Sequence, residues 1–194
     1  MGHNSAGSRF VTGFTLGMAC LLLSAVGGAV VSPTTRYHGL VGDLEKVDTG
    51  AKKITVRAAD GTVHAFSYGG QTVVHGLEAT ARAADLAGKE GSRVLVHYTG
   101  GAGREAAVHI DVFGRDTLKT TEGTISEVDK AGKKVVVKGT DGVNETYDLG
   151  KDSALDTKHG IVDVAHYTGR VGDHVIVYHT EEGGRKVVHL LKHL

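Results

Sequence analysis

The chain has 194 residues, with 22 Lys+Arg against 22 Asp+Glu, so its formal net charge is zero. This balance excludes a strongly basic surface that would attract nucleic acid at long range, and it excludes an acidic tail. Gly accounts for 29 residues and Pro for one, a composition that favours many short strands joined by tight turns.

Residues 1–31 have the pattern of an export signal. Arg9 is the one charged residue before the uncharged run 10–31, and the small residues Gly27, Gly28 and Ala29 offer a cleavage site after Ala29. The alternative is an uncleaved anchor, because an uncharged run of this length can span a bilayer. Either way we expect an exported protein, periplasmic or at the cell surface, that meets the membrane only through this segment.

The rest of the chain is an internal duplication. Residues 42–75 match residues 123–156, 81 positions later, at nine of 34 positions, and SRVLVHYT (92–99) matches DHVIVYHT (173–180) at the same offset. We therefore predict a first repeat over 38–113 and a second over 119–194, after a signal or anchor over 1–31.

Each repeat reads as a small β unit. In the first, strands are predicted over 42–47, 53–58 and 62–68, and Asp60-Gly61 is a strong hairpin signal. An Ala-rich helical run follows over 77–88, and two further strands cover 92–99 and 106–113. Three strands, a short helix or loop, and two strands is the order of a five-stranded OB-type barrel. The predicted fold is therefore mainly β, with two tandem OB-like barrels.

The repeated pattern G-x-[LI]-x-x-V-D, K-K-[IV]-x-V, D-G and G-x-x-V-[LI]-V resembles the tandem small β-barrel domains of exported bacterial proteins, a domain of unknown function similar to bacterial OB-fold periplasmic domains. The resemblance covers both repeats and rests on turn and core positions. It implies a fold and a compartment, and it brings no catalytic residues.

Twelve histidines suggest a second possibility, a metal site. If Thr99 pairs with Glu105, then His97, His109 and Asp111 share one face of the first repeat, where they would converge on Zn²⁺ or Cu²⁺. The alternative is that Asp111 pairs with Arg93 and leaves two partly exposed histidines.

The second repeat is expected to differ at this face. With a one-residue gap, Val108-His109-Ile110 matches Val188-His189-Leu190, and Leu191 replaces the carboxylate. His174, Tyr178 and His189 would then share the face that corresponds to the predicted metal site. The exchange of His97-Tyr98 for Tyr178-His179 places His97 and His179 on opposite sides of their strands.

No catalytic motif is present: the chain lacks H-E-x-x-H, C-x-x-C, G-x-S-x-G and a Walker loop. Nucleic-acid binding is disfavoured by the balanced charge and by the few aromatic residues. We therefore expect a non-enzymatic binding or structural module with no resident cofactor, whose partner is a protein or an envelope polymer, or which associates with itself. The alternative is a His-dependent divalent-metal binding protein.

Overall fold

The computed structural model describes residues 36–76, 81–101, 103–157, 159–162, 167 and 169–194. The predicted signal or anchor over 1–31 lies outside these residues, as does the start of the predicted helical run. Contacts divide the chain into Met1–Pro33 and Thr34–Leu194, and the second unit contains every strand that is described. Whether each repeat is an independent domain stays a prediction.

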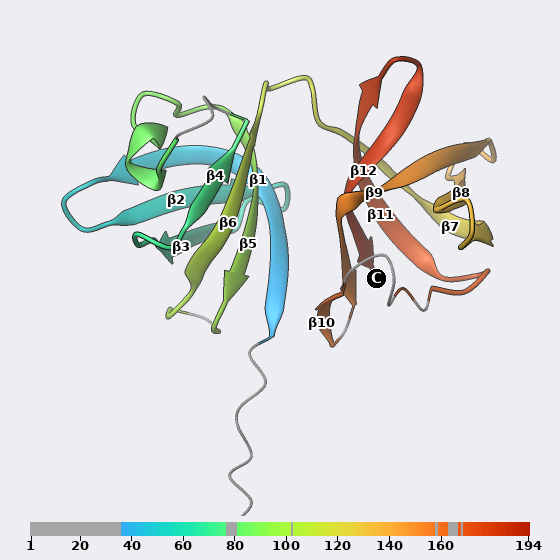
Figure 1. The fold of residues 1–194 in the computed structure, drawn as a ribbon, viewed down its shortest axis with the longest axis horizontal. Helices are drawn as coiled ribbons and strands as arrows, with labels where there is room; N and C mark the ends of the chain where they lie inside the picture. Colours follow the sequence, from blue (N-terminus) through green and yellow to red (C-terminus); the bar gives the residue numbers. More distant parts are fainter. Residues whose placement is uncertain (1–35, 77–80, 102, 158, 163–166, 168) are drawn as a thin grey trace, which may run out of the picture. The chain divides into compact units, whose positions relative to one another are not determined.

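The described chain is mainly β, as predicted, and its strands form two sheets (Figure 1). The first sheet contains β1 (Tyr37–Asp48), β2 (Lys53–Ala58), β3 (Val63–Ser67), β4 (Val73–His75), β5 (Arg93–Thr99) and β6 (Ala106–Phe113). The second contains β7 (Lys119–Asp129), β8 (Lys134–Gly139), β9 (Asn144–Thr157), β10 (Gly160–Val162), β11 (His174–Glu182) and β12 (Arg185–His193).

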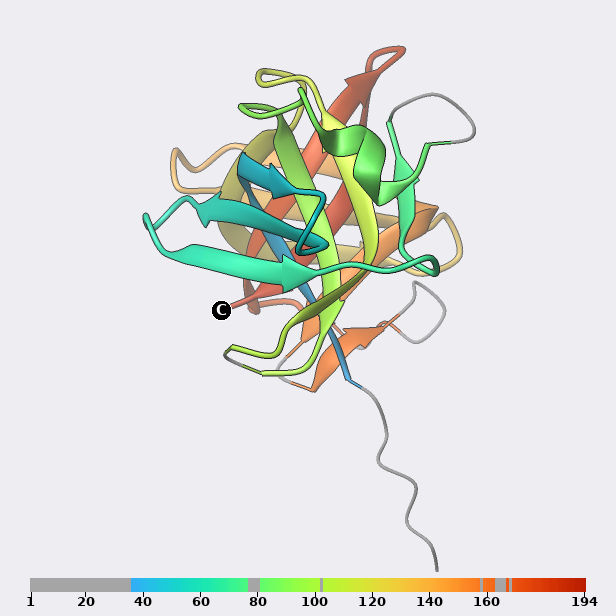
Figure 2. The same cartoon turned by 90° about the vertical axis from the view of Figure 1, so that its left-hand side faces the viewer.

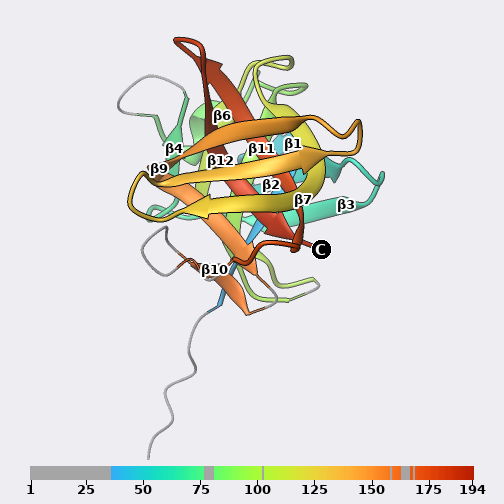
Figure 3. The ribbon, with the colours of Figure 1, turned by 90° about the vertical axis from the view of Figure 1, so that its right-hand side faces the viewer.

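Each sheet closes on itself into a ring of five strands. In the first, pairing runs β3-β2-β1-β5-β6, and β6 closes the ring by pairing parallel to β3 (Figure 2). In the second, pairing runs β9-β12-β11-β7-β8, and β8 pairs with β9 (Figure 3). Five strands in a closed ring leave few free edges, which is how a small sheet protects itself from edge-to-edge association.

The alternation of side chains explains each core. Ile54 and Val56 on β2 are fully buried, as are their counterparts Val135 and Val137 on β8. Phe66 and Tyr147, also counterparts, fill the two cores with no exposed surface. A strand with one buried face requires such period-two spacing, so the hydrophobic pattern sets the inward face.

The turns follow the predicted chemistry. The Asp48 carboxylate accepts a hydrogen bond from the Ala51 amide at 2.8 Å, and Asp129 accepts one from Gly132 at the same distance. Gly61 adopts φ 85°, a left-handed conformation that a β-carbon disfavours. Asp48-Thr49-Gly50 is thus a turn, in agreement with the ordinary use of Asp at this position.

The segment between the third and fourth predicted strands is the part that sequence reasoning placed poorly. Instead of a helix over 77–88, the described part of this run holds a 3₁₀ helix over Ala83–Leu86. Before it, β4 was not predicted at all, and it pairs parallel to β6. In the second repeat, the residues that match β3 and β4 both belong to β9, which is one long strand.

Among the described residues, none forms a helix with the length and apolar character needed to cross a bilayer.

Gly42 and Gly123 occupy equivalent positions in the two repeats, and each lies close to the backbone of the neighbouring strand. A β-carbon on Gly42 would lie 2.3 Å from the Arg57 carbonyl oxygen, and one on Gly123 would lie 2.3 Å from that of Lys138. Because backbone cannot move aside cheaply, we expect Gly42→Ala and Gly123→Ala each to lower the free energy of unfolding by about 1–3 kcal/mol, measured by urea denaturation. Gly69→Ala is the matched control, since nothing lies within 4 Å of its β-carbon position. Equal stability of all three variants would contradict the shared close approach.

Candidate metal centre

Three neighbouring strands of the first sheet bring together one group of polar side chains, which we call the His–Asp cluster: His75, His97, His109 and Asp111. In the backbone pairing, His75 on β4 is opposite Asp111 on β6, and His97 on β5 is opposite His109 on β6. Ile110 lies between the two β6 residues and is fully buried in the core. The cluster therefore projects from the outer face of the sheet, because adjacent residues of a strand point to opposite sides.

Three atoms of the cluster converge. His109 Nε2 lies 2.9 Å from His75 Nδ1 and 3.0 Å from Asp111 Oδ1, and His75 Nδ1 lies 3.5 Å from the same oxygen. We call these atoms the donor triangle. Among the described residues, these three side chains form the one group whose ligand atoms all lie within 4.8 Å of one another.

The size of the donor triangle suits a transition metal. Two ligands of a tetrahedral Zn²⁺ ion with Zn–N bonds of about 2.0–2.1 Å are separated by about 3.3 Å. The three measured separations lie on either side of this value. In the tautomer with a proton on His109 Nε2 and none on His75 Nδ1, one N–H faces two acceptors, whereas a bound cation would use the lone pairs of all three atoms.

The ring planes separate the histidines into two kinds. The rings of His75 and His109 cross at 83° with centroids 4.3 Å apart. The rings of His97 and His109 are stacked, 28° from parallel and 5.2 Å apart. His97 stands apart by distance, because it is not part of the group in which the ligand atoms of His75, His109 and Asp111 all lie within 4.8 Å of one another.

His97 instead lies beside the other oxygen of the carboxylate, with its Nε2 3.7 Å from Asp111 Oδ2. Burial lowers the pKa of His97 to about 4, against the opposing pull of Asp111, and the nearby His109 lowers it further. The imidazole is therefore neutral near pH 7. Its place next to the carboxylate is that of a positioning residue, as is common around metal ligands.

His109 and Asp111 shift each other's pKa. The hydrogen bond to Asp111 raises the pKa of His109 despite the opposing effect of burial. Burial alone would raise the pKa of Asp111, but the hydrogen bond from His109 and the three nearby imidazoles together lower it. Asp111 is thus a carboxylate, which is the form that binds cations.

The structure places all three predicted residues, His97, His109 and Asp111, on one face, and their role as ligands stays a prediction. It adds His75, which sequence reasoning missed because β4 was not predicted. The signal was present in the β-branched pair Val73-Val74 just before His75. The alternative pairing of Asp111 with Arg93 is wrong, because Arg93 Nε lies 3.1 Å from Asp43 Oδ1.

The predicted register between the last two strands was also wrong. Thr99 pairs with Ala106 rather than with Glu105. A bulge then shifts the ladder, so that Tyr98 pairs with Ala107 and His97 pairs with His109. His109 consequently lies next to His97 and not next to Leu95.

A bulge at the equivalent place in the second sheet changes the alignment of the two repeats. In the second sheet Tyr178 pairs with Leu190, and the ladder shifts between Tyr178 and His179. Leu190 therefore occupies the position of His109, and His189 occupies the bulge position of Val108. No gap is needed, and the predicted match of His109 with His189 was wrong.

At the offset of 81, the second repeat has a different set of residues on the equivalent face. The counterparts of His75, His97, His109 and Asp111 are Asp156, Tyr178, Leu190 and Lys192. Lys192 and Asp156 are opposite each other in the ladder, as Asp111 and His75 are. The expected Leu191 belongs instead to the core. The donor triangle is a feature of the first repeat alone within the described chain.

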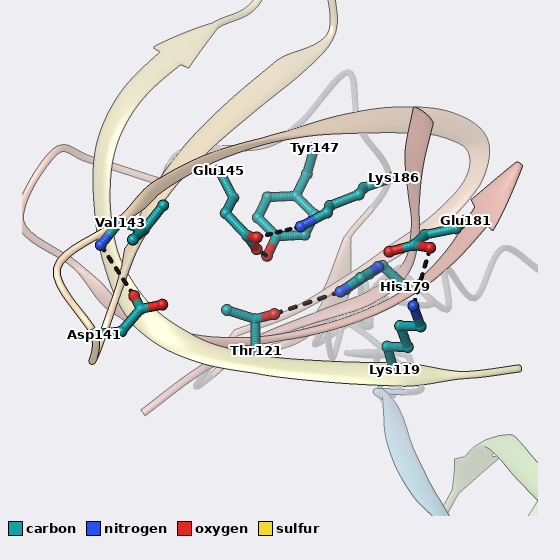
Figure 4. A network of polar contacts seen from close by, with 9 residues as sticks. All are labelled: Lys119, Thr121, Asp141, Val143, Glu145, Tyr147, His179, Glu181 and Lys186. Carbon is teal, nitrogen blue, oxygen red and sulfur yellow. Dashed lines mark hydrogen bonds and ion pairs between the residues drawn. The ribbon is translucent and has the colours of Figure 1, made fainter. Parts of the chain in front are cut away.

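The second repeat has its own polar network on the inner side (Figure 4). The Tyr147 hydroxyl donates to Glu145 Oε2 at 2.5 Å, and Lys186 also binds the Glu145 carboxylate. The ring of His179 lies edge-on to that of Tyr147, with centroids 5.0 Å apart. In the first repeat these two inner positions hold Phe66 and Tyr98, with centroids also 5.0 Å apart. The network is thus a polar version of an aromatic contact in the core.

No family model matches the sequence, and no curated protein matches it. Solved structures with a similar fold include Ag(I)CusF, at 11% identity and a TM-score of 0.32, covering 40% of this chain and 97% of that chain. Apo-CusF from Escherichia coli gives 11% identity and a TM-score of 0.31, covering 40% of this chain and 87% of that one. CSD456 of Drosophila Unr gives 14% identity and a TM-score of 0.32, covering 84% of this chain and 62% of that one. These distant likenesses concern the small β-barrel fold and do not extend to function.

The buried His179 makes the second sheet sensitive to acid. Burial, followed by the charge of Lys186, lowers the pKa of His179 against the opposing carboxylates of Glu145 and Glu181. Because the unfolded pKa is about 6.5, the unfolded state binds the extra proton, and stability falls as the pH drops below that value. We expect His179→Tyr, which places the first-repeat residue there, to weaken this pH dependence in urea denaturation between pH 7.5 and 5. His174→Tyr is the control, and an identical pH dependence in wild type and His179→Tyr would refute the assignment.

Proposed function

We propose that the first repeat binds one divalent transition-metal ion through His75, His109 and Asp111, in an exported protein that acts as a binding module. The observation that supports this function is the donor triangle: two imidazole nitrogens and one carboxylate oxygen with mutual separations of 2.9, 3.0 and 3.5 Å. All three ligand atoms lie within 4.8 Å of one another, as the ligands of a single ion do.

The donor chemistry favours a particular class of ion. Two nitrogens and one oxygen suit Zn²⁺, Cu²⁺ and Ni²⁺, whereas Cu⁺ prefers sulfur ligands. The sulfur-containing residues of the chain are Met1, Met18 and Cys20, all of which precede the first strand. The repeat that carries the cluster therefore offers no thiolate or thioether of its own.

This function reverses the order of the two sequence-based hypotheses. A macromolecular partner, either a protein or an envelope polymer, was the first expectation, and metal binding was the alternative. The convergence of the cluster now favours the metal, because a face adapted only for contact with a polymer has no need for three ligand atoms within 4.8 Å. We retain the proposal that the protein is not an enzyme and that it functions in the periplasm or at the cell surface.

Metal binding should appear as stabilisation, because a ligand that binds only the folded state raises the melting temperature. We expect Zn²⁺, Cu²⁺ or Ni²⁺ to raise it for the wild-type protein, with a stoichiometry of one ion per chain by isothermal titration calorimetry. The double variant His75→Ala/His109→Ala should lose both effects.

The matched control is His174→Ala, which removes an exposed histidine of the second repeat that lies outside the cluster. It should bind the ion as tightly as wild type. Equal binding by the double variant and the wild type would contradict the proposed ligands, and the macromolecular hypothesis would then return as the better one.

Export is a separate proposal that rests on residues 1–31. We expect the protein expressed in a bacterial host to be recovered from the envelope fraction, with an intact mass that corresponds to cleavage after Ala29. A full-length mass in the membrane fraction would indicate the anchor, and recovery of the full-length chain in the cytoplasm would refute export.

A further inference from the structure

The His–Asp cluster supplies three ligands and no fourth, which has a consequence for what the bound metal can do. Structural zinc sites are closed by four protein ligands, whereas sites with three protein ligands keep one position for water or another ligand. His97 is the remaining member of the cluster, and it does not complete the set. Its ring is stacked on that of His109, and its Nε2 lies by Asp111 Oδ2 rather than in the donor triangle.

The exposure of the donors is uneven in a way that leaves one side accessible. The side chain of His75 is 59% exposed, whereas those of Asp111 and His97 are 20% and 15% exposed. His75 belongs to β4, whose ladder partner is β6, with a single further bridge between Val73 and Arg82. A donor from outside would therefore approach on the side of His75.

The charge at the site favours an electron-rich external ligand. A divalent ion bound by one carboxylate and two neutral imidazoles keeps a net positive charge, and a bound ion is the largest local charge in such a site.

We propose that the metal bound by His75, His109 and Asp111 keeps one open coordination position, which accepts a single monodentate donor from outside the chain. The class of ligand is a small anion, which the net positive charge of the bound ion would attract. The inference rests on the proposed function, because it needs a bound metal. It makes the centre able to hold a small anion through the ion.

The test uses the full protein loaded with Co²⁺ and freed of excess metal, with azide as the probe. Retention of one Co²⁺ per chain in wild type and in His174→Ala, but not in His75→Ala/His109→Ala, establishes the metal site itself. Azide should then change the visible Co²⁺ absorption with a saturable, single-site dependence. His174→Ala should respond to azide with the wild-type affinity, because His174 lies outside the cluster.

Two results would overturn the inference while leaving the proposed function intact. The first is a wild-type protein that holds Co²⁺ but shows no spectral response to azide, which would mean a closed site. The second is a response that appears only in His97→Ala, which would identify His97 as the fourth ligand. Failure of the wild type to retain Co²⁺ would instead refute the metal site.

Discussion

The pairing of β5 with β6, with its bulge at Val108, is the constraint on which the rest of the first sheet depends. Ala107 and Ile110 are both buried in the core although they are three residues apart, which regular alternation forbids. The bulge allows both residues to face the core, because it leaves Val108 unpaired and 37% exposed between them. The same shift aligns His109 with His97 and sends Asp111 to the outer face. Core packing and the cluster therefore depend on one local irregularity.

The bulge also explains which parts of the fold could be predicted. Strands such as β2 and β6 were predicted with the observed bounds, because a run of β-branched residues between turn signals is a local pattern. The register between strands is not local, and a single extra residue moves every later contact. Both bulges have a signature in the sequence, which is a pair of apolar core residues three positions apart. The pairs are Ala107 with Ile110 and Val188 with Leu191.

The candidate site was predictable in part for the same reason. His97, His109 and Asp111 lie on two adjacent antiparallel strands, so alternation alone places them on one face. His75 comes from a parallel pairing between β4 and β6, across a separation that no short-range pattern encodes. The shared face of His97, His109 and Asp111 could therefore be predicted, whereas the convergence of His75 with His109 and Asp111 could not. The orientation of a side chain depends on its packing and is fixed only in three dimensions.

The second repeat indicates what the metal would replace. At the two ladder positions where the first repeat has His75 and Asp111, it has Asp156 and Lys192, so each repeat keeps one carboxylate, but on opposite strands. In the second repeat, burial raises the pKa of Asp156, and the positive charge of Lys192 opposes this effect. In the first, the neighbours of the carboxylate are imidazoles, which can be neutral and then offer lone pairs instead of charge. Under the proposed function, a cation bound between them would take the place that the lysine charge has in the second repeat.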